Sequence, residues 1–160
     1  MGAMLPLTGA VAPEGNRHKE GYDLWAKVCN EKGGIRVGDK TYKVKIKYYD
    51  YMSETGTAIK LTEKMITQDG IKFILGPFGS GLTKATSSVS EKYGAVMVVP
   101  TGGSVVAFTS GYKYLFGTLS DNVRIIEPLV EAAMSRQDPP KTAAIAARND
   151  MYTIAVSENF

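Results

Sequence analysis

Short apolar runs alternate with longer amphipathic segments along this chain, and that alternation limits the fold more than any other feature. Apolar runs of strand length predict strands, and apolar residues recurring every 3.6 positions predict helices between them. The expected strands are residues 3–7, 42–49, 71–75, 95–99, 114–116 and 142–147, and the expected helices are 13–32, 53–68, 82–93, 123–134 and 150–158. This order predicts an α/β, doubly wound, mostly parallel sheet of the flavodoxin-like or Rossmann-like kind.

Individual positions within these segments carry more detailed expectations. In the strand 42–49, apolar side chains alternate with lysines, which predicts one face in water and a place at or near a sheet edge. Tyr22 and Trp25 lie on the apolar stripe of the first helix and are expected in the core. Ser53 is expected to cap the second helix. His18, early in the first helix, is expected to face solvent.

Composition sets the class of protein. A chain of 160 residues with 44% hydrophobic and 22% charged residues suits one soluble globular domain with a sizeable core. The net charge of +3 is too small and too scattered to indicate a nucleic-acid partner. The single cysteine, Cys29, excludes an internal disulfide. No run approaches the roughly 20 apolar residues of a membrane helix, and residues 1–5 lack the basic start of a signal peptide.

The candidate binding groups follow the ends of the expected strands. In an open α/β sheet, ligands bind beyond the carboxyl ends of the strands. Here those ends are rich in Gly, Ser and Thr, as in Gly76-Pro-Phe-Gly-Ser80-Gly and Pro100-Thr-Gly-Gly-Ser104. Small hydroxyl groups and free N–H groups at helix starts suit a carboxylate or another small anion. From the turn alone, Ser80 serves equally well as a helix cap or as a ligand contact.

Three enzyme motifs fail at defined positions. A phosphate loop needs lysine where this chain has Leu82, and a dinucleotide fingerprint needs glycine where it has Lys84. A nucleophile elbow around Ser104 lacks its final glycine, because Val106 stands there. With His18 as the only histidine, a Ser/His pair or a metal site is not indicated. No catalytic residue, metal ligand or cofactor is therefore expected.

Four stretches together resemble one family. They are Leu5-Pro-Leu-Thr-Gly9, Tyr49-Asp50, the run from Asp69 to Ser80, and Lys113-Tyr-Leu-Phe-Gly-Thr-Leu119. They resemble the branched-chain amino acid type of extracytoplasmic substrate-binding protein, the receptor component of ABC importers. The resemblance implies two α/β lobes that close on a small ligand, often an amino acid, an amide or an aromatic carboxylate, and no catalytic step.

The resemblance also implies site residues. Ser80 matches the hydroxyl group that binds the ligand carboxylate, and Gly102, Gly103 and Ser104 match the contacts at the next strand end. Three further positions match by their place in the family pattern: Glu14 in the first loop over the ligand, Asp121 near the acidic position that holds an α-amino group, and Tyr152 as the cleft residue of the second lobe.

The family pattern divides the chain unequally. Residues 1–120 match lobe 1, 121–141 a crossover helix and linker, and 142–160 the first strand and part of a helix of lobe 2. Complete members are about twice as long, so an excised lobe or fragment is expected, with weakened ligand binding. The unpaired strand 142–147 would invite a homodimer. The implied partners are a small carboxylate and an ABC permease, and the implied location is periplasmic or extracytoplasmic and lipid-anchored.

Other functions stay open at this stage. A ligand-sensing ectodomain or regulatory module on the same lobe would bind similar ligands but act on a different partner. A small α/β hydrolase or transferase is disfavoured by the missing motifs. A flavodoxin-like scaffold without a ligand is a further alternative.

Overall fold

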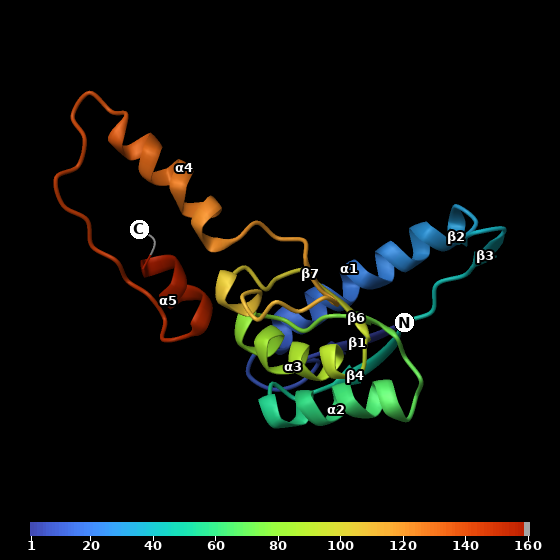
Figure 1. Ribbon diagram of the computed structural model, residues 1–160. Coiled ribbons are helices and arrows are strands. Elements are labelled where there is room, and N and C mark those ends of the chain that lie inside the picture. The colour runs from blue at the N-terminus through green and yellow to red at the C-terminus, as the bar shows by residue number, and fades with distance from the viewer. Residues whose placement is uncertain (159–160) are drawn as a thin grey trace.

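The computed structural model describes residues 1–158 and shows an α/β arrangement around one central sheet (Figure 1). The strands are β1 (Gly2–Leu5), β2 (Ile35–Val37), β3 (Lys40–Tyr42), β4 (Lys47–Asp50), β5 (Phe73–Leu75), β6 (Val96–Val99) and β7 (Leu115–Gly117). The helices are α1 (Ala12–Glu31), α2 (Thr55–Thr67), α3 (Ser80–Lys92), the 3-10 turn η1 (Val105–Ala107), α4 (Asn122–Met134) and α5 (Met151–Glu158). The predicted helices are all present, with ends shifted by a few residues.

The central sheet is parallel throughout and has the strand order β4-β1-β5-β6-β7. Counted along the chain without the separate β2–β3 hairpin, this is the doubly wound order 2-1-3-4-5. The order reverses between β1 and β5, so a crevice is expected where these two neighbouring strands end. The predicted fold class is confirmed, and β4 occupies the sheet edge as predicted.

The two faces of the sheet are covered unequally. Tyr48 and Tyr49 point to opposite faces: Tyr48 donates to Asp23 of α1 at 2.6 Å, and Tyr49 donates to Asp69, just after α2, at 2.5 Å. On the Tyr49 face, α2 and α3 pack side by side over the core (Figure 1). On the opposite face α1 contacts β1, and farther along the sheet Phe73 and Phe116 remain 57% and 52% exposed.

The predicted strand 42–49 forms two separate strands. Residues 43–46 leave the ladder between β3 and β4, because Asn30 at the end of α1 satisfies the backbone there. The Asn30 side chain accepts the N–H group of Val44 at 2.7 Å and donates to its carbonyl group at 2.8 Å. These bonds replace the bonds of a continuous strand and free the β2–β3 hairpin from the sheet.

The predicted strand 142–147 is not formed: these residues are irregular and exposed. A strand needs a neighbour for its backbone groups, and no described residue pairs with this segment. The homodimer expected through that strand stays a prediction. Residues 159 and 160, the end of the expected second-lobe segment, lie outside the described residues.

Two side chains also differ from expectation. Trp25 is 37% exposed rather than part of the core, because α1 contacts the sheet mainly near β1. Ser53 does not cap α2, whose N-cap is Glu54. The backbone of Ser53 is left-handed, with φ at 61°. The Ser53 hydroxyl group accepts the N–H group of Val11 and donates to the carbonyl group of Thr8.

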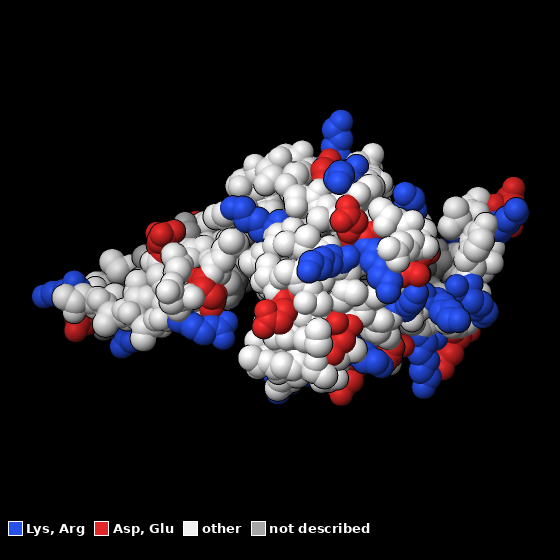
Figure 2. All heavy atoms as spheres, turned by 90° about the horizontal axis from the view of Figure 1, so that it is seen from below, with Lys and Arg blue, Asp and Glu red and all other residues white. Residues whose placement is uncertain are grey.

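The C-terminal part of the chain extends from the body. Figure 1 shows α4 leading away and the following segment returning to α5, which packs against both α3 and α4. Figure 2 shows basic and acidic side chains intermixed over the face it presents, in keeping with the small net charge. Within residues 1–158, no helix is both long and apolar enough to cross a membrane.

Candidate functional site

A pocket of about 430 Å³ opens where β1, β5 and β6 end, beside the reversal of strand order. Loops after the strands and the start of α3 supply most of its wall, and the segment around the start of α5 supplies the rest. Its lining includes Val11, Tyr51, Phe78, Ser80, Thr101 and Tyr152. Loops carried on a rigid sheet are where binding groups usually lie.

The turn from β5 into α3 presents donors to this pocket. Gly79 is the helix N-cap with φ at 85°, a left-handed conformation that favours glycine. The next three residues, 80–82, have backbone N–H groups with no acceptor among the described residues. Free N–H groups at a helix start attract an anion. The turn therefore offers a place for a carboxylate.

Ser80 is the first residue of α3 and not its cap. Its side chain is 2% exposed, and its Oγ accepts the backbone N–H group of Ser104 at 3.1 Å. The hydroxyl group of Ser104 is fully buried and has no hydrogen-bond partner among the described residues. The two predicted serines are therefore joined by a hydrogen bond from the Ser104 backbone to the Ser80 side chain. Ser104 itself does not line the pocket.

Gly102 and Gly103 allow close packing beneath the pocket. A Cβ atom on Gly102 would lie 2.9 Å from Oγ1 of Thr83, and one on Gly103 would lie 2.8 Å from Cε2 of Tyr152. These two glycines line a neighbouring cavity of about 420 Å³ that Asp121 also lines. Asp121 caps α4 by accepting the Arg124 N–H group at 3.0 Å.

The predicted site residues thus lie in different parts of the structure. Ser80 and Tyr152 line the main pocket, whereas Gly102, Gly103 and Asp121 line the neighbouring cavity. Glu14, in the first turn of α1, lines neither cavity. Their roles toward a ligand stay predictions.

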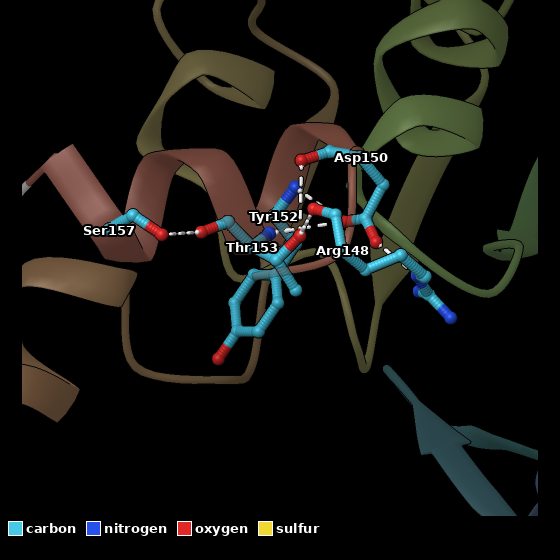
Figure 3. Close-up of polar contacts among 5 residues, drawn as sticks. All are labelled: Arg148, Asp150, Tyr152, Thr153 and Ser157. Atoms are coloured by element: carbon cyan, nitrogen blue, oxygen red, sulfur yellow. Dashed lines mark hydrogen bonds and ion pairs between the residues drawn. The ribbon is translucent and has the colours of Figure 1, made fainter. Parts of the chain in front are cut away.

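The start of α5 is shaped by Asp150 (Figure 3). Its Oδ1 accepts the N–H groups of Tyr152 and Thr153, both at 3.0 Å, and its Oδ2 pairs with Arg148. The N–H group of Thr153 is the main cause that holds the pKa of Asp150 below its usual range, with help from Arg148. Since Arg148, Asp150 and Tyr152 all line the pocket, this cap sets its outer wall.

Asp50 holds the loops on the opposite wall. Its carboxylate accepts the N–H groups of Leu7 at 2.9 Å and Met52 at 2.8 Å, and the hydroxyl group of Thr8 at 2.7 Å. Partial burial raises the pKa of Asp50, but these bonds outweigh burial and the pKa is lowered. Next to it, burial raises the pKa of Tyr51, and the Asp50 charge adds to the rise.

Sequence reasoning missed several pocket residues. Thr101 and Phe78 line the pocket, and both contact His18, which is half-buried rather than solvent-facing. Tyr22, one turn later on α1, donates to the Gly76 carbonyl group at 3.1 Å. Burial is the main cause that raises the pKa of Tyr22, and the nearby Tyr51 adds to the rise. The predicted sheet topology could have indicated that α1 lies beside the pocket, because α1 is the element that follows β1 at the reversal of strand order.

The fold and the pocket define a class of protein, an α/β binding domain that receives a small molecule where parallel strands end. The family can also be stated. The chain belongs to the periplasmic binding protein family, whose sequence model matches residues 1–158. Among residues 1–158, no group of three or more His, Cys, Asp or Glu side chains is arranged to hold a metal ion.

Similar proteins have been described in several bacteria. Leu/Ile/Val-binding protein homolog 3 of Brucella melitensis is 29% identical over 145 residues, which cover 91% of this chain and 38% of that protein. Leu/Ile/Val-binding protein BraC3 of Rhizobium johnstonii is 36% identical over 101 residues, or 63% of this chain and 26% of that protein. The chain therefore spans about two fifths of such relatives or less.

Solved structures share the fold. The branched-chain amino acid transporter substrate binding protein LivJ of Streptococcus pneumoniae, in complex with isoleucine, aligns with a TM-score of 0.78 at 22% identity, covering 99% of this chain and 44% of that chain. A solute binding protein of an ABC transporter from R. palustris, in complex with benzoate, aligns with a TM-score of 0.67 at 25% identity, covering 83% and 35%. The predicted resemblance is confirmed, and the relatives are binding proteins rather than enzymes.

Proposed function

We propose that this chain forms the ligand-binding lobe of a solute receptor for an ABC importer. Its task is the non-covalent capture of a small carboxylate, such as an amino acid or an aromatic acid. The observation that carries this is the buried Ser80 in a pocket at the strand ends, beside three helix N–H groups that have no acceptor within residues 1–158. Binding proteins with isoleucine and with benzoate share the fold, which supports both ligand classes.

The capture mechanism follows from the groups that surround the pocket. The N–H groups at the start of α3 would hold the carboxylate, because a helix N-terminus favours negative charge. The rings of Phe78 and Tyr152, both in the pocket wall, would cover the apolar part of the ligand. No covalent step is needed.

The proposed partner is an ABC permease, and the proposed location is extracytoplasmic. Residues 1–120 would form most of one lobe, with 142–160 belonging to a second lobe that closes over the pocket. The intervening residues 121–141, which comprise α4 and a mostly exposed stretch after it, suit a connection between the lobes. Closure would bury the ligand and present the closed receptor to the permease.

Titration of the isotope-labelled 160-residue chain with L-leucine and with sodium benzoate tests the proposal. We expect shifts of the amide resonances of residues 79–82, even for weak binding by one lobe. The amide resonance of Ser88 serves as the control and should not move, because Ser88 is an exposed serine farther along the same helix. Absence of any shift with both probes would contradict the proposal.

A further inference from the structure

His18 connects α1 to the floor of the pocket. Its ring Nδ1 lies 2.7 Å from the carbonyl oxygen of Glu14, and its Nε2 lies 3.2 Å from Oγ1 of Thr101. The ring also packs edge-on against Phe78, with centroids 5.5 Å apart. Both Thr101 and Phe78 line the pocket, whereas His18 stands behind them.

The partners of the ring decide where its hydrogen lies. A carbonyl oxygen can only accept, so Nδ1 carries the hydrogen and donates it to Glu14. In the neutral ring Nε2 then has a lone pair, and it accepts the hydroxyl hydrogen of Thr101. The Gly79 N–H group donates to the same Thr101 oxygen across a longer distance of 3.4 Å. One histidine thereby fixes a threonine at the ends of two neighbouring strands.

We propose that His18 is a positioning residue that controls which way the Thr101 hydroxyl group donates. While the ring is neutral, the hydroxyl hydrogen points to Nε2 and is withheld from the pocket. When the ring is protonated, Nε2 becomes a donor to Thr101, and the hydroxyl hydrogen is released toward the pocket. This inference rests on the proposed function, because the released donor would serve the carboxylate of a bound ligand.

Other charged groups lie near His18 and around the pocket. Glu14 and Lys19 neighbour His18 on α1, and Arg148 and Asp150 line the same pocket as Thr101. Tyr22 and Tyr51, whose pKa values burial raises, stay neutral. An imidazole is the side chain whose protonation changes its hydrogen-bonding role from acceptor to donor. A comparison of the wild type with His18→Gln therefore isolates the effect of this ring.

The first experiment follows the ring and the turn without any ligand. His18 is the only histidine, so its ring nitrogens give a single set of NMR resonances. We expect the Nδ1–H form at high pH, and we expect the Gly79 amide resonance to move together with protonation of His18. Thr101→Val should abolish that coupling, whereas Thr101→Ser and the distant exposed Thr67→Val should preserve it. An Nε2–H ring, or a Gly79 amide that ignores His18, would overturn the proposal.

The second experiment measures the affinity for L-leucine and for benzoate at high and low pH. In the wild-type chain we expect binding at least about threefold tighter once His18 is protonated, because a donor to a charged group is gained. His18→Gln retains an acceptor for Thr101 but does not titrate, so it should keep the high-pH affinity at both pH values. A pH dependence that survives in His18→Gln would overturn the proposal. If neither probe binds at all, the proposed function fails, while the ring and amide resonances still decide the role of His18.

Discussion

Asn122 ties α4 to α5, because its side-chain Nδ2 donates to the carbonyl oxygen of Ala155 at 2.9 Å. The same side chain is fully buried and accepts the Val105 N–H group at 3.1 Å through Oδ1. Its own backbone N–H group donates to Gly103 at 2.8 Å. One amide side chain thus fixes α5, and with it Tyr152, against the loop after β6.

Asn122→Ala should release α5 from the body. The substitution leaves the Val105 N–H group without its acceptor and removes the donor to Ala155, a loss of about 1–3 kcal/mol. We expect faster amide hydrogen exchange throughout α5 and a lower urea midpoint. The control is Asn149→Ala, at an exposed asparagine. Equal exchange rates in Asn122→Ala and the wild type would show that α5 is held by other contacts.

Gly103→Ala should push Tyr152 out of place. The added methyl group would lie 2.8 Å from the Tyr152 ring, closer than carbon atoms pack, and we expect a cost of about 1–3 kcal/mol. In a Tyr152→Ala background the ring is gone and the same change should cost much less, so the double-mutant cycle isolates the contact. Gly81→Ala is the matched control, since a Cβ atom there meets nothing within 4 Å. Additive effects of the two changes would refute the contact.

Ser80→Ala should weaken both the strand-end loop and ligand binding. The buried N–H group of Ser104 loses its acceptor, which we expect to cost about 1–2 kcal/mol of unfolding free energy. Binding of L-leucine or benzoate should fall about tenfold, measured by calorimetry beside Ser88→Ala. A loss of stability with unchanged affinity would assign Ser80 to the loop alone.

Asp50 should make the fold sensitive to acid. Its pKa is lowered in the folded protein, so its bonds stabilise the fold at pH values above its ordinary value of 3.8. That stabilisation is lost as the pH falls from there through the lowered pKa. Asp50→Asn should therefore be less stable than the wild type at neutral pH, and the difference should shrink toward about pH 2. Urea unfolding across this range measures it, with the exposed Asp39→Asn as control. A difference that stays constant with pH would contradict this role of Asp50.

The central sheet could be predicted because short apolar runs alternate clearly with longer amphipathic segments in that part of the chain. Strands such as β5 and β6 are short apolar runs between helices, and right-handed crossovers leave few ways to order them. The segment 142–147 is also a short apolar run, although an alanine-rich one, and it forms no strand. Propensity alone does not make a strand when no neighbour supplies its hydrogen bonds. Likewise, the break at Val44 depends on Asn30, fourteen positions earlier, and no local pattern reveals it.

The pocket was predicted less completely than the fold. Ser80 could be named from its glycine-rich turn and from the family resemblance, Tyr152 from the resemblance alone, and both line the pocket. Thr101 was passed over because a threonine at a strand end has no chemical signature of its own. His18 was placed in solvent because its helical position says nothing about the loops that fold back over α1. Such contacts between distant segments arise only in the folded chain.

The exposed sheet face around Phe73 and Phe116, together with the C-terminal part that extends from the body, affects how the stability of the fold depends on temperature. The accessible surface is 9833 Å², whereas a compact monomer of this 17.3 kDa mass exposes about 7,800 Å². Apolar surface that is already hydrated in the native state adds nothing to the heat capacity of unfolding. Calorimetry should therefore give a heat-capacity change of unfolding below the usual value of about 12–15 cal/mol/K per residue. The stability of this chain should consequently vary less steeply with temperature, in the cold as well as in the heat.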